Sequence, residues 1–248
     1  MAFTVVFQPI VALEDLRVLG YEALARFPGD LQASPDRWFA AAEQLGLRYD
    51  LELAAVKKAL NCFEDLPPDT YLSINASPRT IASPVLARML SKVEPARIVV
   101  EISESEAIGD FPRFAEAIDE LRELGVRLAL DDTGSGEVSL QSLLAVHPDV
   151  VKIDTELTRS IDTSPERQAV TLALAVLAAR SGATSLAEGV ETEEELSTVR
   201  SLGVEAAQGF LLGRPDRLSA LLGRRARIEK ESRAAPSNET GVQSGHVS

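Results

Sequence analysis

The sequence predicts an α/β fold, a TIM-like (β/α)8 barrel whose first strand runs antiparallel to its neighbours. Eight short apolar or β-branched runs alternate with helical patterns along the chain, which is typical of parallel strands joined by helical crossovers. The first two runs are separated only by residues 12–15, a connection short enough only for an antiparallel hairpin. The 248 residues, 45% hydrophobic and 25% charged, match one α/β barrel with a large core.

The predicted strands follow from these runs in order. They are Phe3–Val11, Arg17–Arg26, Thr70–Ile74, Arg97–Ile102, Val126–Leu130, Val150–Ile153, Thr184–Ala187 and Ala206–Leu211. Two helices are predicted between the second and third strands, one at 38–45 capped by Ser34 before Pro35, and one at 49–63. The other helical patterns lie near 78–91, 110–124, 164–181, 192–202 and 215–223.

Composition and charge exclude several classes of function. The 25 basic and 38 acidic side chains give a net charge of −13, which repels nucleic acid polymers and anionic membranes. One cysteine, Cys62, and two distant histidines, His147 and His246, exclude a structural zinc cluster and disfavour a cysteine or serine nucleophile paired with histidine. No secretory signal is visible, and the apolar stretch 170–179 is half of a membrane span, so we expect a cytoplasmic protein that does not bind membranes.

Composition changes once along the chain. Residues 1–223 read as one barrel domain, whereas residues 224–248 are nearly devoid of apolar side chains after Ile228 and accumulate Pro, Ser, Asn and Gly. We predict a frayed helix extension followed by a disordered tail.

Polar residues come at the ends of the predicted strands. Because the carboxyl ends of barrel strands point to one face, these side chains are expected to converge on one pocket. They are Glu22, Asn75, Glu101, Asp131, Asp132, Lys152, Glu188 and Gln208, with Arg26 following Glu22.

Several carboxylates gathered without histidine cannot all stay charged and unpaired. Mg²⁺ or Mn²⁺ resolves the conflict, since both ions prefer carboxylate, amide and water oxygens. The adjacent Asp131 and Asp132 can hold two ions at the roughly 3.5 to 4 Å separation of two-metal phosphoesterases. The cations would also let an acidic protein accept a phosphodiester.

Each of these residues also has a plain structural interpretation. A single acid after a strand is often a helix N-cap or a solvated loop residue. Lys152 could instead form a structural salt bridge with Asp154 or Glu188. The joint occurrence of these residues at successive strand ends favours a site.

The motifs together resemble the EAL-domain cyclic di-GMP phosphodiesterases, over about Phe3 to Leu222 and in the family's order. The segments that carry the resemblance are FQPI from Phe7, EALAR from Glu22, Ile74-Asn75, EISE from Glu101, Asp131-Asp132, KID from Lys152, AEGVE from Ala187 and QGFLLGRP from Gln208. The resemblance implies a barrel that hydrolyses cyclic di-GMP to linear pGpG with two Mg²⁺ or Mn²⁺ ions per active site, usually as a homodimer.

The resemblance also implies a role for each matched residue. Glu22, Asn75, Glu101 and Asp131 match ligands of one metal, and Asp131 and Asp132 match ligands of the second. Lys152 matches the lysine that orients the attacking water, and Glu188 matches a proposed general base. Gln8, Arg26, Gln208 and Pro215 match residues that line the nucleotide site, and Glu104 and Glu191 match acids that stabilise loops.

One segment departs from the family pattern. Where the family has Asp-Asp-Phe-Gly-(Thr/Ala)-Gly-Tyr, this chain has Asp131-Asp-Thr133-Gly-Ser-Gly-Glu137, so both aromatic side chains are missing. The lost packing area is expected to weaken the loop 133–138 and to reduce activity.

Two alternatives to a phosphodiesterase remain open. The altered loop leaves open a catalytically weak or inactive EAL protein that serves as a cyclic di-GMP receptor or binds a protein partner. A Schiff-base lyase using Lys152 is disfavoured, because the neighbouring carboxylates would keep this lysine protonated.

Overall fold

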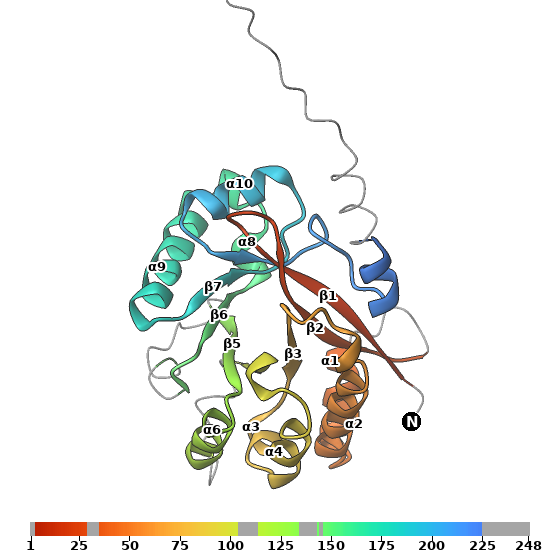
Figure 1. Ribbon diagram of the computed structural model, residues 1–248. Coiled ribbons are helices and arrows are strands. Elements are labelled where there is room, and N and C mark those ends of the chain that lie inside the picture. Colours follow the sequence, from red (N-terminus) through yellow and green to blue (C-terminus); the bar gives the residue numbers. More distant parts are fainter. Residues whose placement is uncertain (1–2, 29–34, 104–113, 134–142, 144–145, 225–248) are drawn as a thin grey trace, which may run out of the picture.

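The computed structural model describes residues 3–28, 35–103, 114–133, 143 and 146–224. Eight strands form a closed barrel in sequence order, β1 to β8, with helices packed around it (Figure 1). The strands are β1 (Thr4–Ala12), β2 (Val18–Arg26), β3 (Tyr71–Asn75), β4 (Ile98–Ser103), β5 (Arg127–Thr133), β6 (Val150–Ile153), β7 (Thr184–Ala187) and β8 (Ala206–Ala207).

The first strand has the predicted direction. β1 pairs antiparallel with β2, Gln8 facing Glu22, and closes the barrel antiparallel to β8, Val11 facing Ala207. Every pairing from β2–β3 to β7–β8 is parallel. The predicted fold class is therefore confirmed.

The helices lie between the strands in the predicted places. The described α-helices are α1 (Pro35–Gln44), α2 (Arg48–Leu60), α3 (Pro78–Ile81), α4 (Pro84–Leu90), α6 (Phe114–Glu123), α8 (Thr155–Thr158), α9 (Pro165–Ser181) and α10 (Glu193–Ser201), and residues 218–224 are also helical. Short 3₁₀ turns occur at Phe63–Asp65, Pro95–Arg97 and Ile161–Thr163.

The predicted helix at 78–91 and the predicted strand at 206–211 differ clearly from the structure, and β5 extends past its predicted end at Leu130. The expected helix at 78–91 is two helices, because Ser83 caps α4 with its side chain and Pro84 starts the new helix. The expected strand at 206–211 ends after Ala207. Beyond it, Gly209 lies so close to Val190 that an added Cβ would be 2.0 Å from the Val190 carbonyl oxygen.

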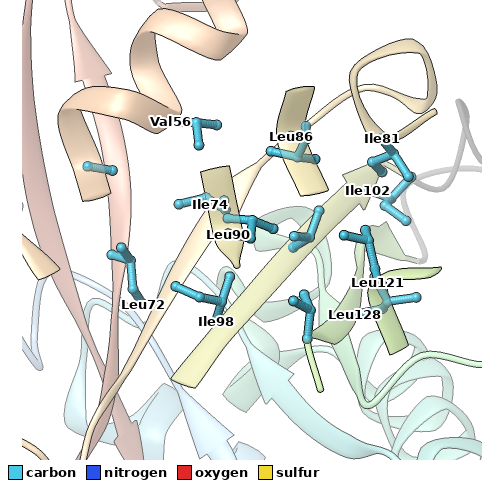
Figure 2. Packing of buried hydrophobic residues seen from close by; sticks show 14 of the residues in the cluster. Val56, Leu72, Ile74, Ile81, Leu86, Leu90, Ile98, Ile102, Leu121 and Leu128 are labelled. Carbon is cyan, nitrogen blue, oxygen red and sulfur yellow. The ribbon is translucent and has the colours of Figure 1, made fainter. Parts of the chain in front are cut away.

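Alternation along each strand separates the two sides of the barrel wall. On β4, Ile98, Val100 and Ile102 face the helices, where they pack with residues of α2, α3, α4 and α6 (Figure 2). The intervening Val99 belongs to an interior apolar layer completed by Ile10, Ala129, Val150, Leu186 and Ala206. Glu101, two residues after Val99, therefore lies on the interior side, above this layer.

The largest hydrophobic cluster includes the outer side chains of β3, β4 and β5 and the helices that cover these strands. Leu72, Leu86, Leu90 and Leu128 have no exposed surface (Figure 2). A barrel wall packed this tightly holds the strand ends in fixed relative positions.

No helix within the described ranges is long and apolar enough to cross a membrane. The predicted tail, 224–248, lies outside the described residues except for Arg224, whose guanidinium bonds the Asp216 carboxylate.

Candidate active site

The predicted polar residues meet at the carboxyl ends of the strands. Glu22 and Asn75 come from β2 and β3, Glu101 from β4, Asp131 and Asp132 from β5, Lys152 from β6, and Glu188 and Gln208 directly follow β7 and β8. The barrel register places Asn75 beside Glu101 and Ser103 beside Asp131. The convergence predicted from sequence is what the structure shows.

The Lys152 ammonium lies at the centre of this group. Its Nζ is 2.9 Å from Glu101 Oε2, 3.0 Å from Asp131 Oδ1, 2.9 Å from Glu188 Oε1 and 3.9 Å from Glu22 Oε1. Burial would lower the pKa of Lys152, but the attraction of the four carboxylates outweighs it and holds the pKa well above its ordinary value. A permanently charged amine disfavours Schiff-base chemistry.

Of the two salt-bridge partners weighed for Lys152, only Glu188 is correct. Asp154 instead caps α8, its Oδ1 accepting a hydrogen bond from the Glu156 backbone N–H at 2.6 Å. An aspartate just before a helix satisfies an otherwise unpaired N–H group in this way.

Glu22 is buried, and each of its carboxylate oxygens accepts a hydrogen bond from an amide side chain. Asn75 Nδ2 donates to its Oε1 at 3.1 Å, and Gln208 Nε2 donates to its Oε2 at 2.6 Å. Gln208 Nε2 also donates to Gln8 Oε1 at 3.1 Å, and Gln8 Nε2 donates to the Gly213 carbonyl at 3.0 Å. Gln8 and Gln208 therefore lie behind Glu22 in the barrel interior.

Glu101 is the most deeply buried acid of the group. Its Oε1 accepts a hydrogen bond from Ser73 Oγ at 2.5 Å, while its Oε2 contacts Lys152. Burial, reinforced by the negative charges of Glu22 and Asp131, raises the pKa of Glu101 well above its usual range, although Lys152 and Ser73 oppose this rise.

An irregularity in β5 aims Asp131 and Asp132 at the same place. The β5–β6 register shifts between Leu130 and Thr133, and Asp132 has a positive φ of 57°, which aspartate tolerates better than most residues. Burial and the Asp131 charge raise the pKa of Asp132 to about 6. Sequence reasoning placed the two acids correctly but missed this bulge, because a local register shift leaves no period-two signature.

Asp131, Asp132 and Glu188 each offer an oxygen within 4.8 Å of the others. Burial raises the pKa of Glu188 to about 8, since the nearby Lys152 only partly offsets it. Burial and the nearby negative charges thus oppose ionisation of Asp132 and Glu188. A bound cation would offset this effect.

The donor set fits hard divalent cations. Glu22, Asn75, Glu101, Asp131 and Asp132 supply carboxylate and amide oxygens, the ligands that Mg²⁺ and Mn²⁺ prefer. The Lys152 ammonium already acts as a cation beside three of these acids, Glu22, Glu101 and Asp131, and beside Glu188. Nearby, Gln208 Oε1 is buried with no hydrogen-bond partner among the described residues.

A cavity of about 350 Å³ opens beside the acidic group. Its lining includes the acidic group and its amide, Glu22, Asn75, Glu101, Asp131 and Asp132, together with Arg26, Phe39, Arg48, Glu52 and Ser77. Burial lowers the pKa of Arg26, and Glu22 opposes the change. A cation held by the acids and a guanidinium lining the same cavity would suit an anionic ligand.

The remaining predicted residues are less central or fall outside the described part. Pro215 is half-buried in the segment after β8, and Asp216 next to it pairs with Phe7 of β1. Glu191 is exposed, and its backbone N–H donates to Glu195 Oε2. Glu104 and Glu137 lie outside the described residues, whereas Thr133 is fully buried at the end of β5.

Two buried polar residues near the site were missed from sequence. Ser73 contacts Glu101, and Glu52 of α2 accepts hydrogen bonds from Ser77 and Thr80, just after Asn75. Ser73 alternates with apolar residues in β3, so its inward position was readable, but its partner was not.

The sequence matches the family model of the EAL domain over residues 2–215. The chain belongs to the EAL domain family. This confirms the family resemblance inferred from the strand-end motifs.

Individual proteins with similar sequences agree with this family membership. The chain is 29% identical over 227 residues to the cyclic di-GMP phosphodiesterase PdeF of Escherichia coli K12, covering 87% of this chain and 30% of PdeF. It is 31% identical over 216 residues to the blue light- and temperature-regulated antirepressor BluF of the same organism, covering 84% of this chain and 53% of BluF. The chain thus spans only part of these relatives.

A solved structure also shares the fold. The complex of Klebsiella pneumoniae BlrP1 with manganese and cyclic di-GMP at pH 9.0 superimposes with a TM-score of 0.77 at 34% identity, over 87% of this chain and 56% of that one. That protein binds manganese and the cyclic dinucleotide together.

Proposed function

We propose that this chain hydrolyses cyclic di-GMP to linear pGpG in a reaction that depends on Mg²⁺ or Mn²⁺. The observation that carries the proposal is the Lys152 ammonium surrounded by Glu22, Glu101, Asp131 and Glu188 at the mouth of a barrel. Family membership and the similarity to PdeF and BlrP1 support cyclic di-GMP as the substrate.

Glu22, Asn75, Glu101 and Asp131 would hold one metal ion, and Asp131 with Asp132 a second. Two such ions supply an activated water and neutralise the phosphodiester. The positive charge of the ions would offset the carboxylates within the site, so that an acidic chain could accept the phosphodiester there.

Lys152 and Glu188 would act on the attacking water. The water oxygen bonds to phosphorus while one phosphorus–oxygen ester bond breaks, so the water loses a proton and the leaving oxygen gains one. Glu188 would accept the first proton, and its pKa of about 8 is close enough to neutral pH for the carboxyl to exchange a proton there. Lys152 would orient the water by donating a hydrogen bond.

Arg26 and Pro215 would contribute to the nucleotide site. Arg26 lines the same cavity as the acids, and its guanidinium can donate two hydrogen bonds to a phosphate oxygen pair. We propose loop-stabilising roles for Glu104 and Glu191 on the family resemblance alone.

The resemblance also leads us to propose a homodimer. Leu172 and Val176, one turn apart on α9, are exposed, and a dimer formed through this helix would cover them. Light scattering on the parent and on Val176→Glu tests this, with a dimer expected for the parent and a monomer for the variant.

The function is tested by incubating the purified chain with cyclic di-GMP and Mg²⁺, Mn²⁺ or Ca²⁺ and separating the products. We expect pGpG with Mg²⁺ or Mn²⁺, none in excess chelator, and inhibition by Ca²⁺, whose looser coordination misplaces water and phosphorus. Full activity in chelator would contradict the two-metal site. Binding of cyclic di-GMP without turnover would instead support a receptor.

A further inference from the structure

In each of the two buried glutamates of the acidic group, Glu101 and Glu22, one carboxylate oxygen accepts a hydrogen bond from a buried side chain, Ser73 or Gln208. Ser73 has 1% of its surface exposed, and its hydroxyl donates to Glu101 Oε1 at 2.5 Å. The other oxygen of Glu101, Oε2, lies 2.9 Å from the Lys152 ammonium. Only one oxygen of this carboxylate therefore faces the cation.

Gln208 donates a corresponding hydrogen bond to one oxygen of Glu22. Its Nε2 donates to Glu22 Oε2 at 2.6 Å, which leaves Oε1 on the side of Asn75 and Lys152. Gln208 is itself anchored by Gln8, and both are buried. Neither Ser73 nor Gln208 is among the described residues that line the cavity.

We propose that Ser73 and Gln208 are positioning residues that force Glu101 and Glu22 to present a single oxygen each to the bound cation. This rests on the proposed metal-dependent function. It gives Gln208 a role different from the substrate contact that the family resemblance implies, and it assigns a role to Ser73.

One-oxygen binding by Glu101 and Glu22 would affect which metal ion the site prefers. Mg²⁺ and Mn²⁺ favour compact octahedral sites, whereas Ca²⁺ accepts more oxygens and binds carboxylates through both of them. With the rear oxygen held by Ser73 or Gln208, Glu101 and Glu22 cannot swing to two-oxygen binding. The two donors would therefore favour the smaller ions over Ca²⁺.

Calorimetric titration of the full chain with Mn²⁺ and with Ca²⁺, without nucleotide, tests this proposal. The variants are Ser73→Ala, Gln208→Met and the control Ser185→Ala. Ser185 is also a buried barrel-strand serine, but its hydroxyl bonds the Glu205 backbone N–H, away from the acids. Melting in chelator checks that Ser73→Ala folds as well as Ser185→Ala.

We expect Ser73→Ala and Gln208→Met to lose affinity for Mn²⁺ by about 10- to 100-fold, as other losses of a metal-ligand support do. Affinity for Ca²⁺ should fall less, so the Mn²⁺/Ca²⁺ preference drops, while Ser185→Ala matches the parent. Equal affinities and equal preference in Ser73→Ala and Ser185→Ala would overturn the proposal. So would a Gln208→Met variant that weakens cyclic di-GMP binding while keeping the parent's metal affinities. A parent chain that binds no Mn²⁺ would overturn the proposed function and this inference together.

Discussion

At the scale of single residues, the site holds more negative than positive charge in a buried place. Four carboxylates converge on one ammonium, so at least part of the negative charge must be neutralised by protons or by cations. The raised pKa values of Glu101 and Glu188 are the result of this crowding in a buried place. The residues were predictable because each ends a strand, whereas their individual partners depend on side-chain geometry that sequence does not encode.

Lys152→Ala should stop turnover and also destabilise the metal-free protein. Removing one partner of a buried charge cluster leaves carboxylates unpaired, which costs about 3 kcal/mol in comparable cases. Thermal melting in chelator should show this loss, and Mn²⁺ should raise the melting temperature of Lys152→Ala more than that of the parent.

Asp131→Ala should respond to Mn²⁺ and to cyclic di-GMP differently from Lys152→Ala. It removes an oxygen ligand, so Mn²⁺ should stabilise it little, and binding of cyclic di-GMP should fall because the phosphates lose their counterions. Lys152→Ala should keep most of the nucleotide binding. If calorimetry shows that both variants lose nucleotide binding equally, the separate roles of metal ligand and water-orienting lysine are wrong.

The metal-free protein should lose stability as the pH rises through 8. Glu188 has a folded-state pKa of about 8, above the ordinary value of 4.5, so its protonated form favours the folded state. That contribution is complete below about pH 4.5 and disappears as the pH passes 8. Melting temperatures in chelator should therefore fall between pH 6 and 9 in the parent, with a shallower fall in Glu188→Gln; identical slopes would contradict this.

At the scale of elements, the loops after β6, β7 and β8 are locked together by their backbones. Gly189, next to Glu188, has a φ of 68°, and a Cβ there would lie 2.5 Å from Thr155 Cγ2. The Val190 N–H donates to the Gln208 carbonyl, and the Leu211 N–H donates to the Val190 carbonyl. These contacts fix Glu188 relative to Lys152 and Gln208.

Gly189→Ala should reduce activity at least tenfold and destabilise the fold more than Gly203→Ala. Gly203 has a similar φ of 82° but nothing within 4 Å of an added Cβ, so its substitution costs only the left-handed strain of about 1 to 2 kcal/mol. Adding Thr155→Ala should partly restore Gly189→Ala. Indistinguishable melting temperatures and rates in the two glycine variants would show that the close contact does not position Glu188.

The elements also show where sequence reasoning ends. The strand of 150–153 was predicted to the residue, because a short apolar run has clear limits, but β5 extends three residues past the predicted Leu130. The extension carries Asp131 and Asp132, which read as loop residues because acids are rare in strands. The break between α3 and α4 was marked in the sequence by Ser83-Pro84, and its meaning was missed.

At the scale of the whole molecule, the barrel is needed to unite residues from Gln8 to Gln208. Closure of β8 on β1 brings these two side chains within 3.1 Å although 200 positions separate them. The fold class could be predicted because the alternation of strands and helices allows few other topologies.

Removal of the residues after Arg233 should leave the melting temperature unchanged. The sequence of this segment has few apolar side chains, so we expect it to add no buried surface to the folded state. Scanning calorimetry of the full and shortened chains measures this; a large drop on truncation would mean that the tail docks on the barrel.

The most direct test of the proposed hydrolysis is a single-turnover reaction in ¹⁸O-labelled water, with the chain in excess over cyclic di-GMP and with Mn²⁺ present. Excess protein makes even a slow enzyme convert all of its substrate, so an effect of the altered loop on rate cannot hide the chemistry. We expect complete conversion to pGpG that carries one ¹⁸O atom on its terminal phosphate, and no conversion in chelator. Cyclic di-GMP recovered intact after binding, or pGpG without the label, would contradict the proposed hydrolysis.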